Sequence, residues 1–220
     1  IMIVITGASS GVGMHCAKLY KQSGKTVVNI SRRKSEFADV NILKNLREGS
    51  EIKSAAQAVK EIDEPIEAII NSIGVFGQET FGNITEAEIQ RHMETNVQAP
   101  MLLISELIER IKKDETDVLN VVSKVGVVGS TTSPVYSSSK WAERGFTLSL
   151  QELLKDTPSR VISFCPGGIR TELFDKSGAD VATKNWMEPS AIALFIKQIL
   201  ELPKNMEVSE VIVNRKAVHD

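Results

Sequence analysis

The sequence has little of what builds disulfide frameworks, metal centres or membrane spans. Its 220 residues include two cysteines and three histidines. Cys16 and Cys165 lie far apart without metal-ligand spacing, so we expect reduced thiols in a cytoplasmic protein and no metal site. No apolar run is long enough to cross a bilayer, and no charged-then-apolar signal segment is present, so we expect no membrane attachment.

An excess of charge of one sign is also missing. The formal net charge is −2, which gives no electrostatic basis for binding nucleic acid or an anionic membrane. Hydrophobic residues make up 42% of the chain and charged residues 25%, which is the profile of a globular protein with a buried core. The length favours one large α/β domain over residues 1–220.

Short apolar runs alternate with helical patterns along the chain. Strands are predicted at 2–5, 26–30, 66–70, 117–122, 160–165 and 209–213, and helices at 12–22, 50–62, 85–113, 134–154 and 189–200. Residues 33–48 have no clear pattern. Apolar strands separated by helices indicate a Rossmann-type, doubly wound parallel sheet covered on both faces. In such sheets, ligands bind at the carboxyl ends of the strands.

A glycine-rich turn joins the first predicted strand to the first predicted helix. It reads Thr6-Gly7-Ala8-Ser9-Ser10-Gly11-Val12-Gly13. Glycines allow a tight turn and let the backbone approach a pyrophosphate, and the helix N-terminus offers free N–H groups. Met14 stands where a Walker loop needs lysine, so that class of site is excluded. The turn predicts a dinucleotide site at Gly7, Ser9, Ser10, Gly11, Val12 and Gly13.

The end of the second predicted strand bears on the choice of cofactor. An acidic residue there would bind a ribose hydroxyl and favour NAD, but this chain has Ser31 followed by Arg32 and Arg33. Guanidinium groups suit a phosphate through charge-assisted, bidentate bonds. The sequence therefore favours NADP(H), with NAD(H) possible. The alternative is a basic loop that faces only solvent.

Tyr136 and Lys140 form the clearest candidate for chemistry. Pro134 suits the first turn of a helix, and residues four apart on a helix lie on one face. A neighbouring ammonium favours the phenolate form of a tyrosine, which suits proton exchange with a carbonyl or alcohol. Taken alone, the spacing is also common by chance, and the alternative is a surface tyrosine beside a solvated lysine.

Four further motifs, with the glycine turn and the Tyr136–Lys140 pair, resemble the short-chain dehydrogenase/reductase family over nearly the whole chain. They are Asn71-Ser72-Ile73-Gly74, Asn96 within the helix 85–113, Ser123 thirteen residues before Tyr136, and Pro166-Gly167-Gly168-Ile169-Arg170-Thr171. The family's counterparts are Asn-Asn-Ala-Gly, a helical asparagine, a strand-end serine and Pro-Gly-x-x-x-Thr. Six matches in the right order are highly specific, although each one alone is weak.

The resemblance implies a catalytic set. Tyr136 is then the general acid/base, Ser123 orients the substrate oxygen, Lys140 assists Tyr136 and holds the nicotinamide ribose, and Asn96 anchors a water that relays protons. The cofactor supplies the hydride. Besides the turn, Arg32, Arg33, Tyr136 and Lys140, the resemblance implies cofactor contacts at Asn45, Leu46, Asn71, Ser72, Gly74, Pro166, Gly167, Ile169 and Thr171.

The chain departs from the family pattern in three places. Asn45 stands where many members have an aspartate that contacts adenine. Ser72 and Ile73 replace the second and third residues of the Asn-Asn-Ala-Gly motif. Ser10 stands where many NADP-preferring members have a basic residue, so the preference for NADP(H) rests on Arg32 and Arg33.

Pro100 adds a hypothesis about Asn96. Because proline has no N–H, it cannot donate the i→i−4 hydrogen bond to the Asn96 carbonyl. We expect a kink there and a free carbonyl that holds the relay water. The alternative is an ordinary kink that fits the helix to the sheet.

Apolar residues outside the motifs predict a substrate lid and a subunit interface. Residues 168–189 look irregular and are predicted to form the lid, with Leu173, Phe174, Trp186 and Met187 on it and Phe76 and Phe81 on the opposite wall. The family commonly pairs two helices into homodimers or homotetramers. Candidates for that interface, or for core packing instead, are Met93, Met101, Leu107, Ile108, Trp141, Ala142, Phe146 and Leu150.

Together these patterns predict an oxidoreductase that reduces a small, fairly apolar ketone or aldehyde with NADPH and works reversibly. One alternative is an NAD-dependent alcohol dehydrogenase of the same family. Another is a non-catalytic protein that senses a dinucleotide, which the complete set Asn96, Ser123, Tyr136 and Lys140 argues against. The expected partners are small molecules and further copies of the same chain.

Overall fold

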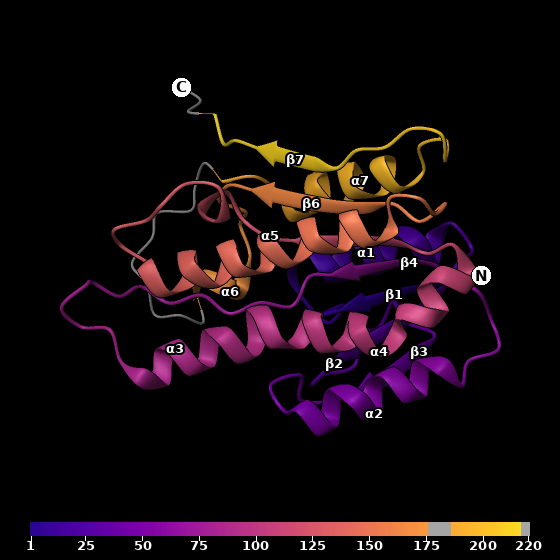
Figure 1. Cartoon of the computed structure of the whole chain (residues 1–220), viewed down its shortest axis with the longest axis horizontal. Helices are drawn as coiled ribbons and strands as arrows, with labels where there is room; N and C mark the ends of the chain where they lie inside the picture. Colours follow the sequence, from indigo (N-terminus) through magenta and orange to yellow (C-terminus); the bar gives the residue numbers. More distant parts are fainter. Residues whose placement is uncertain (176–185, 217–220) are drawn as a thin grey trace.

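The computed structural model describes residues 1–175 and 186–216, and a seven-stranded parallel sheet is the central layer of this part (Figure 1). The strands are β1 (Met2–Thr6), β2 (Thr26–Ser31), β3 (Val40–Leu43), β4 (Ile66–Asn71), β5 (Asp117–Val121), β6 (Val161–Pro166) and β7 (Glu210–Val213). Their order is β3-β2-β1-β4-β5-β6-β7. The predicted doubly wound sheet is confirmed, and its order reverses between β1 and β4, where such folds bind ligands.

Helices cover both faces of the sheet because alternate strand residues are buried on opposite sides. In β1, Met2 and Val4 join one apolar cluster, whereas Ile3 and Ile5 join the other. The first cluster lies under α2 (Gly49–Lys60), α4 (Ala99–Asp114) and α5 (Pro134–Leu154), and the second lies under α1 (Gly11–Gln22) and α7 (Pro189–Leu200) (Figure 1). Every helix in the described ranges is too short or too polar to cross a membrane.

The helix predicted over 85–113 is divided in three. It begins as α3 (Glu86–His92), where Thr85 caps the first turn by accepting the Glu88 N–H. A π-helical segment, η1 (Met93–Gln98), follows, and the Glu94 carbonyl accepts from the Ala99 N–H five residues on. The expected irregularity before Pro100 is therefore present, but as a widened turn rather than a simple kink. The relay-water hypothesis stays a prediction.

β3 is the strand that the sequence pattern did not place. It lies at the sheet edge, is four residues long, and buries only Ile42. Its alignment with β2 is supported by a side-chain hydrogen bond from Asn29 Nδ2 to Asn41 Oδ1 of 2.8 Å. A short edge strand with one buried residue has no periodicity to detect.

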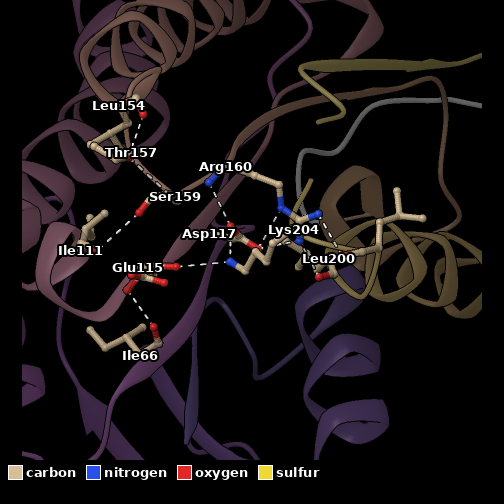
Figure 2. Close-up of polar contacts among 12 residues, drawn as sticks. Ile66, Ile111, Glu115, Asp117, Leu154, Thr157, Ser159, Arg160, Leu200 and Lys204 are labelled. Atoms are coloured by element: carbon tan, nitrogen blue, oxygen red, sulfur yellow. Dashed lines mark hydrogen bonds and ion pairs between the residues drawn. The ribbon is translucent and has the colours of Figure 1, made fainter. Parts of the chain in front are cut away.

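The end of the sheet opposite the predicted site is fixed by a buried ion pair (Figure 2). Asp117 begins β5, and Arg160 immediately precedes β6. Arg160 Nη2 lies 2.7 Å from Asp117 Oδ2 and 2.8 Å from the carbonyl of Leu200, the last residue of α7. Lys204 Nζ lies 2.7 Å from Asp117 Oδ1. One carboxylate and one guanidinium thus tie two strands to the end of the last helix.

Candidate functional site

The carboxyl ends of the strands enclose a cavity of about 900 Å³. Ser123, Tyr136 and Lys140 line it, as do Arg32 and Arg33. Every other predicted site residue also lines it, except Gly13, Asn71 and Asn96. The fold therefore brings motifs from across the whole sequence to one edge of the sheet, at a volume typical of small-molecule sites.

The glycine turn needs its glycines for two different reasons. Gly7 and Gly11 have φ of 77° and 57°, in the left-handed region that favours glycine. Gly13 lies behind the turn, where an added Cβ would stand 2.6 Å from the Gly7 carbonyl oxygen. Gly13 thus permits close packing of α1 on the turn. Ser10, the N-cap of α1, makes no side-chain cap, and first-turn N–H groups lack partners within a helix, so they suit a pyrophosphate.

The loop after β2 presents two cations to the cavity. Ser31 Oγ donates to the Arg33 carbonyl at 2.6 Å, which folds the backbone back on itself. Arg32 and Arg33 are both exposed, and neither has an ion-pair partner in the part of the chain that the structure describes. Two unpaired guanidinium groups at the cavity wall are the arrangement expected for binding an added phosphate.

The end of β4 is joined to the end of β1. Thr6 Oγ1 accepts the Ser72 N–H at 3.1 Å, and Ser72 Oγ donates to the Thr6 carbonyl at 2.6 Å. Asn71 is buried beneath, with its Nδ2 donating to Asn120 Oδ1 at 2.8 Å. Asn71 therefore stabilises the sheet beneath the cavity, while Ser72 and Gly74 line the cavity itself.

Asn96 lies in η1 and is fully buried. Its Oδ1 accepts the Val75 N–H at 2.8 Å, and its Nδ2 donates to the Val75 carbonyl and to Ser139 Oγ, both at 3.0 Å. Ser139 Oγ in turn donates to the Tyr136 carbonyl at 2.7 Å. The side chain thus links the loop after β4 to α5, with both of its amide hydrogens donated within the protein, and the predicted relay water would bind the main-chain carbonyl.

Ser123, two residues after β5, and Tyr136, on α5, both line the cavity. Ser123 caps the short helix η2 (Lys124–Gly126), and its Oγ accepts the Val125 N–H at 3.3 Å. Pro134 opens α5 as predicted. Tyr136 is 7% exposed and is held by Phe76, whose ring meets it edge-on with centroids 5.0 Å apart. Packing fixes the ring while leaving Tyr136 on the cavity wall.

Lys140 has a buried partner that sequence reasoning missed. Its Nζ donates to Glu143 Oε2 at 2.6 Å and to the Val121 carbonyl at 3.0 Å. Burial raises the pKa of the Glu143 carboxyl to about 7, against the pull of the lysine charge. Burial also acts to lower the pKa of Lys140, but Glu143 and then Tyr136 outweigh it, so that pKa lies above its usual value. The i,i+3 spacing from Lys140 was the available signal.

A charge cluster that no spacing indicated includes His92, whose ring centroid lies 6.1 Å from that of Tyr136. One nitrogen of His92 and one oxygen each of Glu79 and Glu88 lie within 4.8 Å of one another. Arg91 Nη2 pairs with Glu88 at 2.7 Å, which gives the cluster a cation. Glu79 is buried, and burial together with the Glu88 charge raises the pKa of its carboxyl.

The predicted apolar walls are placed in part. Phe76, Leu173 and Trp186 line the cavity. Phe81 does not: it is 72% exposed, because the chain after Gly77 turns outward at residues 80–83. Met187 packs into the core, and its backbone pairs with Gly168 and Arg170. The middle of the predicted lid, 176–185, and the Phe174 side chain lie outside the described part.

The predicted interface residues divide between core and surface. Leu107 and Leu150 are buried in the core, and Ile108 and Phe146 pack against it. Met93, Met101 and Trp141 are exposed, at 40%, 40% and 45%. Ala142 is half-buried. The exposed three lie on η1, α4 and α5, which are neighbours on one face of the sheet (Figure 1).

Sequence relatives and solved structures match this chain over nearly its whole length. An uncharacterized oxidoreductase of Staphylococcus epidermidis is 28% identical over 222 residues, which cover 96% of this chain and 95% of the relative. The ketoacyl reductase HetN of Nostoc sp. is 28% identical, with 98% and 79% covered. A short-chain dehydrogenase/reductase structure from Vibrio parahaemolyticus has a TM-score of 0.84 at 28% identity, with 98% of this chain and 100% of that chain covered.

A solved serine dehydrogenase complexed with NADP+, in its closed form, has a TM-score of 0.88 at 19% identity, with 97% of this chain and 94% of that chain covered. At 19% identity, this similarity shows a shared fold and nothing more. The model of the short chain dehydrogenase family matches residues 1–182, most of the chain. With the glycine turn, Ser123, Tyr136 and Lys140 around one cavity, this protein belongs to the short-chain dehydrogenase family of NAD(P)-dependent oxidoreductases.

Proposed function

We propose that the protein reduces a ketone or aldehyde to an alcohol with NADPH, reversibly. The observation that carries the proposal is the composition of one cavity. Its wall includes the proton-transfer groups Ser123, Tyr136 and Lys140 and also the guanidinium groups of Arg32 and Arg33, which have no ion-pair partner among the described residues. A single dinucleotide with an added phosphate would span these two groups of residues.

The cofactor, when bound, supplies the hydride, and the protein supplies position and protons. The glycine turn and the N-terminus of α1 would hold the pyrophosphate, and Arg32 and Arg33 the phosphate on the adenosine ribose. Tyr136 donates its hydroxyl proton to the substrate oxygen during reduction. Ser123 donates a hydrogen bond to the same oxygen and fixes its orientation.

The substrate is a small, fairly apolar carbonyl compound. Phe76, Leu173 and Trp186 on the cavity wall support this class. A relative named as a ketoacyl reductase supports the direction of the reaction. The free, buried thiols of Cys16 and Cys165 support a reducing, cytoplasmic location. Exposed apolar side chains on α4 and α5 support self-association as a homodimer or homotetramer.

The proposal is tested first by cofactor binding. NADPH and NADH are titrated by nicotinamide fluorescence into wild type, Arg32→Ala/Arg33→Ala and Lys34→Ala. Lys34 is the matched control, because it is an exposed neighbour that does not line the cavity. We expect tighter binding of NADPH than NADH, and a loss of about tenfold or more in the double variant alone. Equal binding of both cofactors, unchanged by mutation, would make the NADP assignment wrong.

Turnover is tested with Tyr136→Phe, which removes the acidic proton while keeping the ring that Phe76 packs against. A reductase should lose turnover on a panel of ketones and aldehydes and keep its affinity for NADPH. A non-catalytic sensor would show no turnover in wild type on any member of the panel. Failure of wild type to bind either cofactor would refute both readings.

A further inference from the structure

We propose that Glu143 is a positioning residue that keeps Lys140 charged and directs its ammonium toward the cavity. The proposal rests on the proposed function, because it concerns the lysine that serves Tyr136 there. Glu143 lies on α5 one turn after Lys140, and both side chains are almost fully buried, 3% exposed for Lys140 and 1% for Glu143.

The contacts of Lys140 account for its orientation. An ammonium group has three hydrogens to donate. Two acceptors are in place, Glu143 Oε2 at 2.6 Å and the Val121 carbonyl at 3.0 Å. Lys140 also lines the cavity beside Gly74, where an added Cβ would lie 3.8 Å from Nζ. With two hydrogens committed to the protein, one is left for a ligand hydroxyl in the cavity.

Glu143 is committed to this pair by its neighbourhood. The adjacent Arg144 is paired with Glu210 at 2.6 Å, so it does not compete for the carboxylate. Thr147 Oγ1 donates to the backbone carbonyl of Glu143 at 2.8 Å and not to its carboxylate. Among the described residues, Glu143 forms its ion pair with Lys140.

The electrostatic consequence follows from burial. A buried ammonium without a counter-charge loses its proton readily, because burial penalises the charged form. The titratable groups that face the pair are Tyr136 on α5, Cys165 on β6 and His92 at the end of α3. Glu143 is the carboxylate among these groups. Its charge therefore favours the ammonium form of Lys140.

The composition of the chain allows a direct test, since it contains two tyrosines, Tyr20 and Tyr136. Tyr20 is 1% exposed, and burial raises its pKa far above the usual value. The ultraviolet absorbance of tyrosinate, followed against pH, therefore reports Tyr136, and Tyr136→Phe supplies the blank. In Glu143→Gln, which is nearly isosteric, we expect the midpoint to rise by about one pH unit or more.

The matched control is Glu152→Gln. Glu152 forms an exposed i,i+3 pair with Lys155 on the same helix, so the same chemical change should leave the midpoint unmoved. A midpoint in Glu143→Gln that is unchanged or lowered would overturn the proposal. If Glu143→Gln does not fold, Glu143→Asp is used instead, because it keeps the negative charge but places it farther from Lys140. It should shift the midpoint in the same direction by less.

This titration needs neither cofactor nor substrate, so its outcome is separate from that of the proposed function. A second readout applies once a substrate is known. The alkaline fall in kcat for carbonyl reduction, where Tyr136 loses the proton that it donates, should begin at higher pH in Glu143→Gln, with kcat in acid equal to that of wild type. A uniform loss of kcat at every pH would indicate a merely structural role and would overturn the proposal.

Discussion

Removing the carboxylate at the far end of the sheet should destabilise the protein without changing its chemistry. Asp117 is 2% exposed and accepts from the Arg160 guanidinium and backbone N–H and from Lys204 Nζ (Figure 2). In Asp117→Ala the Arg160 guanidinium keeps, among the described residues, the carbonyl oxygens of Leu200, Leu202, Pro203 and Met206 as partners and has lost its counter-charge. Breaking a buried pair by removing one member costs about 3–5 kcal/mol. For a chain of this size, that lowers Tm by about 6–20 °C.

The assay is thermal unfolding followed by circular dichroism, with Glu152→Ala as the control. Glu152 and Lys155 are an exposed pair, with side chains 72% and 56% exposed. Glu152→Ala should therefore lower the free energy of unfolding by less than about 1 kcal/mol. At a temperature where both proteins are folded, the Kd for NADPH should equal that of wild type, because Asp117 lies at the opposite end of β5 from Ser123. A Tm loss as small as the control's, or a weakened Kd, would refute the reasoning.

Three further changes test separate parts of the molecule. Glu79→Gln should raise Tm by about 2 °C or more at pH 8. The pKa of Glu79 is raised in the folded state, so its ionisation lowers the free energy of unfolding once the pH exceeds the pKa of this group in the unfolded chain. Near pH 4 the carboxyl is protonated in the folded state, so the Tm difference between Glu79→Gln and wild type should vanish there. Trp141→Lys should shift sedimentation toward monomer, and an unchanged profile would exclude the α4–α5 face as the interface. Gly13→Ala should weaken NADPH binding about tenfold or more or prevent folding, since its Cβ would stand 2.6 Å from the Gly7 carbonyl oxygen; normal binding would contradict that packing.

The sequence was sufficient where local pattern decides structure. The apolar run of β1 and the capping residue Thr85 predicted their elements because each signal lies within a few residues. The spacing of Ser123, Tyr136 and Lys140 predicted a shared site because Ser123 follows a strand and the other two residues lie one helical turn apart. All three line one cavity.

The sequence was insufficient where burial depends on distant parts of the chain. Glu143 shares a helix face with Lys140, but a glutamate on a helix is most often exposed, and only packing against other elements buries this one. Glu79 meets His92 because a loop returns to α3, which no spacing records. Phe81 was assigned to the cavity wall because the outward turn after Gly77 has no apolar signature.

The amide of Asn96 substitutes for a neighbouring strand. It offers Val75 one acceptor and one donor, at 2.8 and 3.0 Å, as a peptide group across a sheet would. A loss of activity in Asn96→Ala would therefore be ambiguous, because the change would release the loop after β4 and the Ser139 link to Tyr136 as well as disturb any water on the main chain. A genetic test of the predicted proton relay therefore has to act on the backbone, at Pro100, and leave that amide in place.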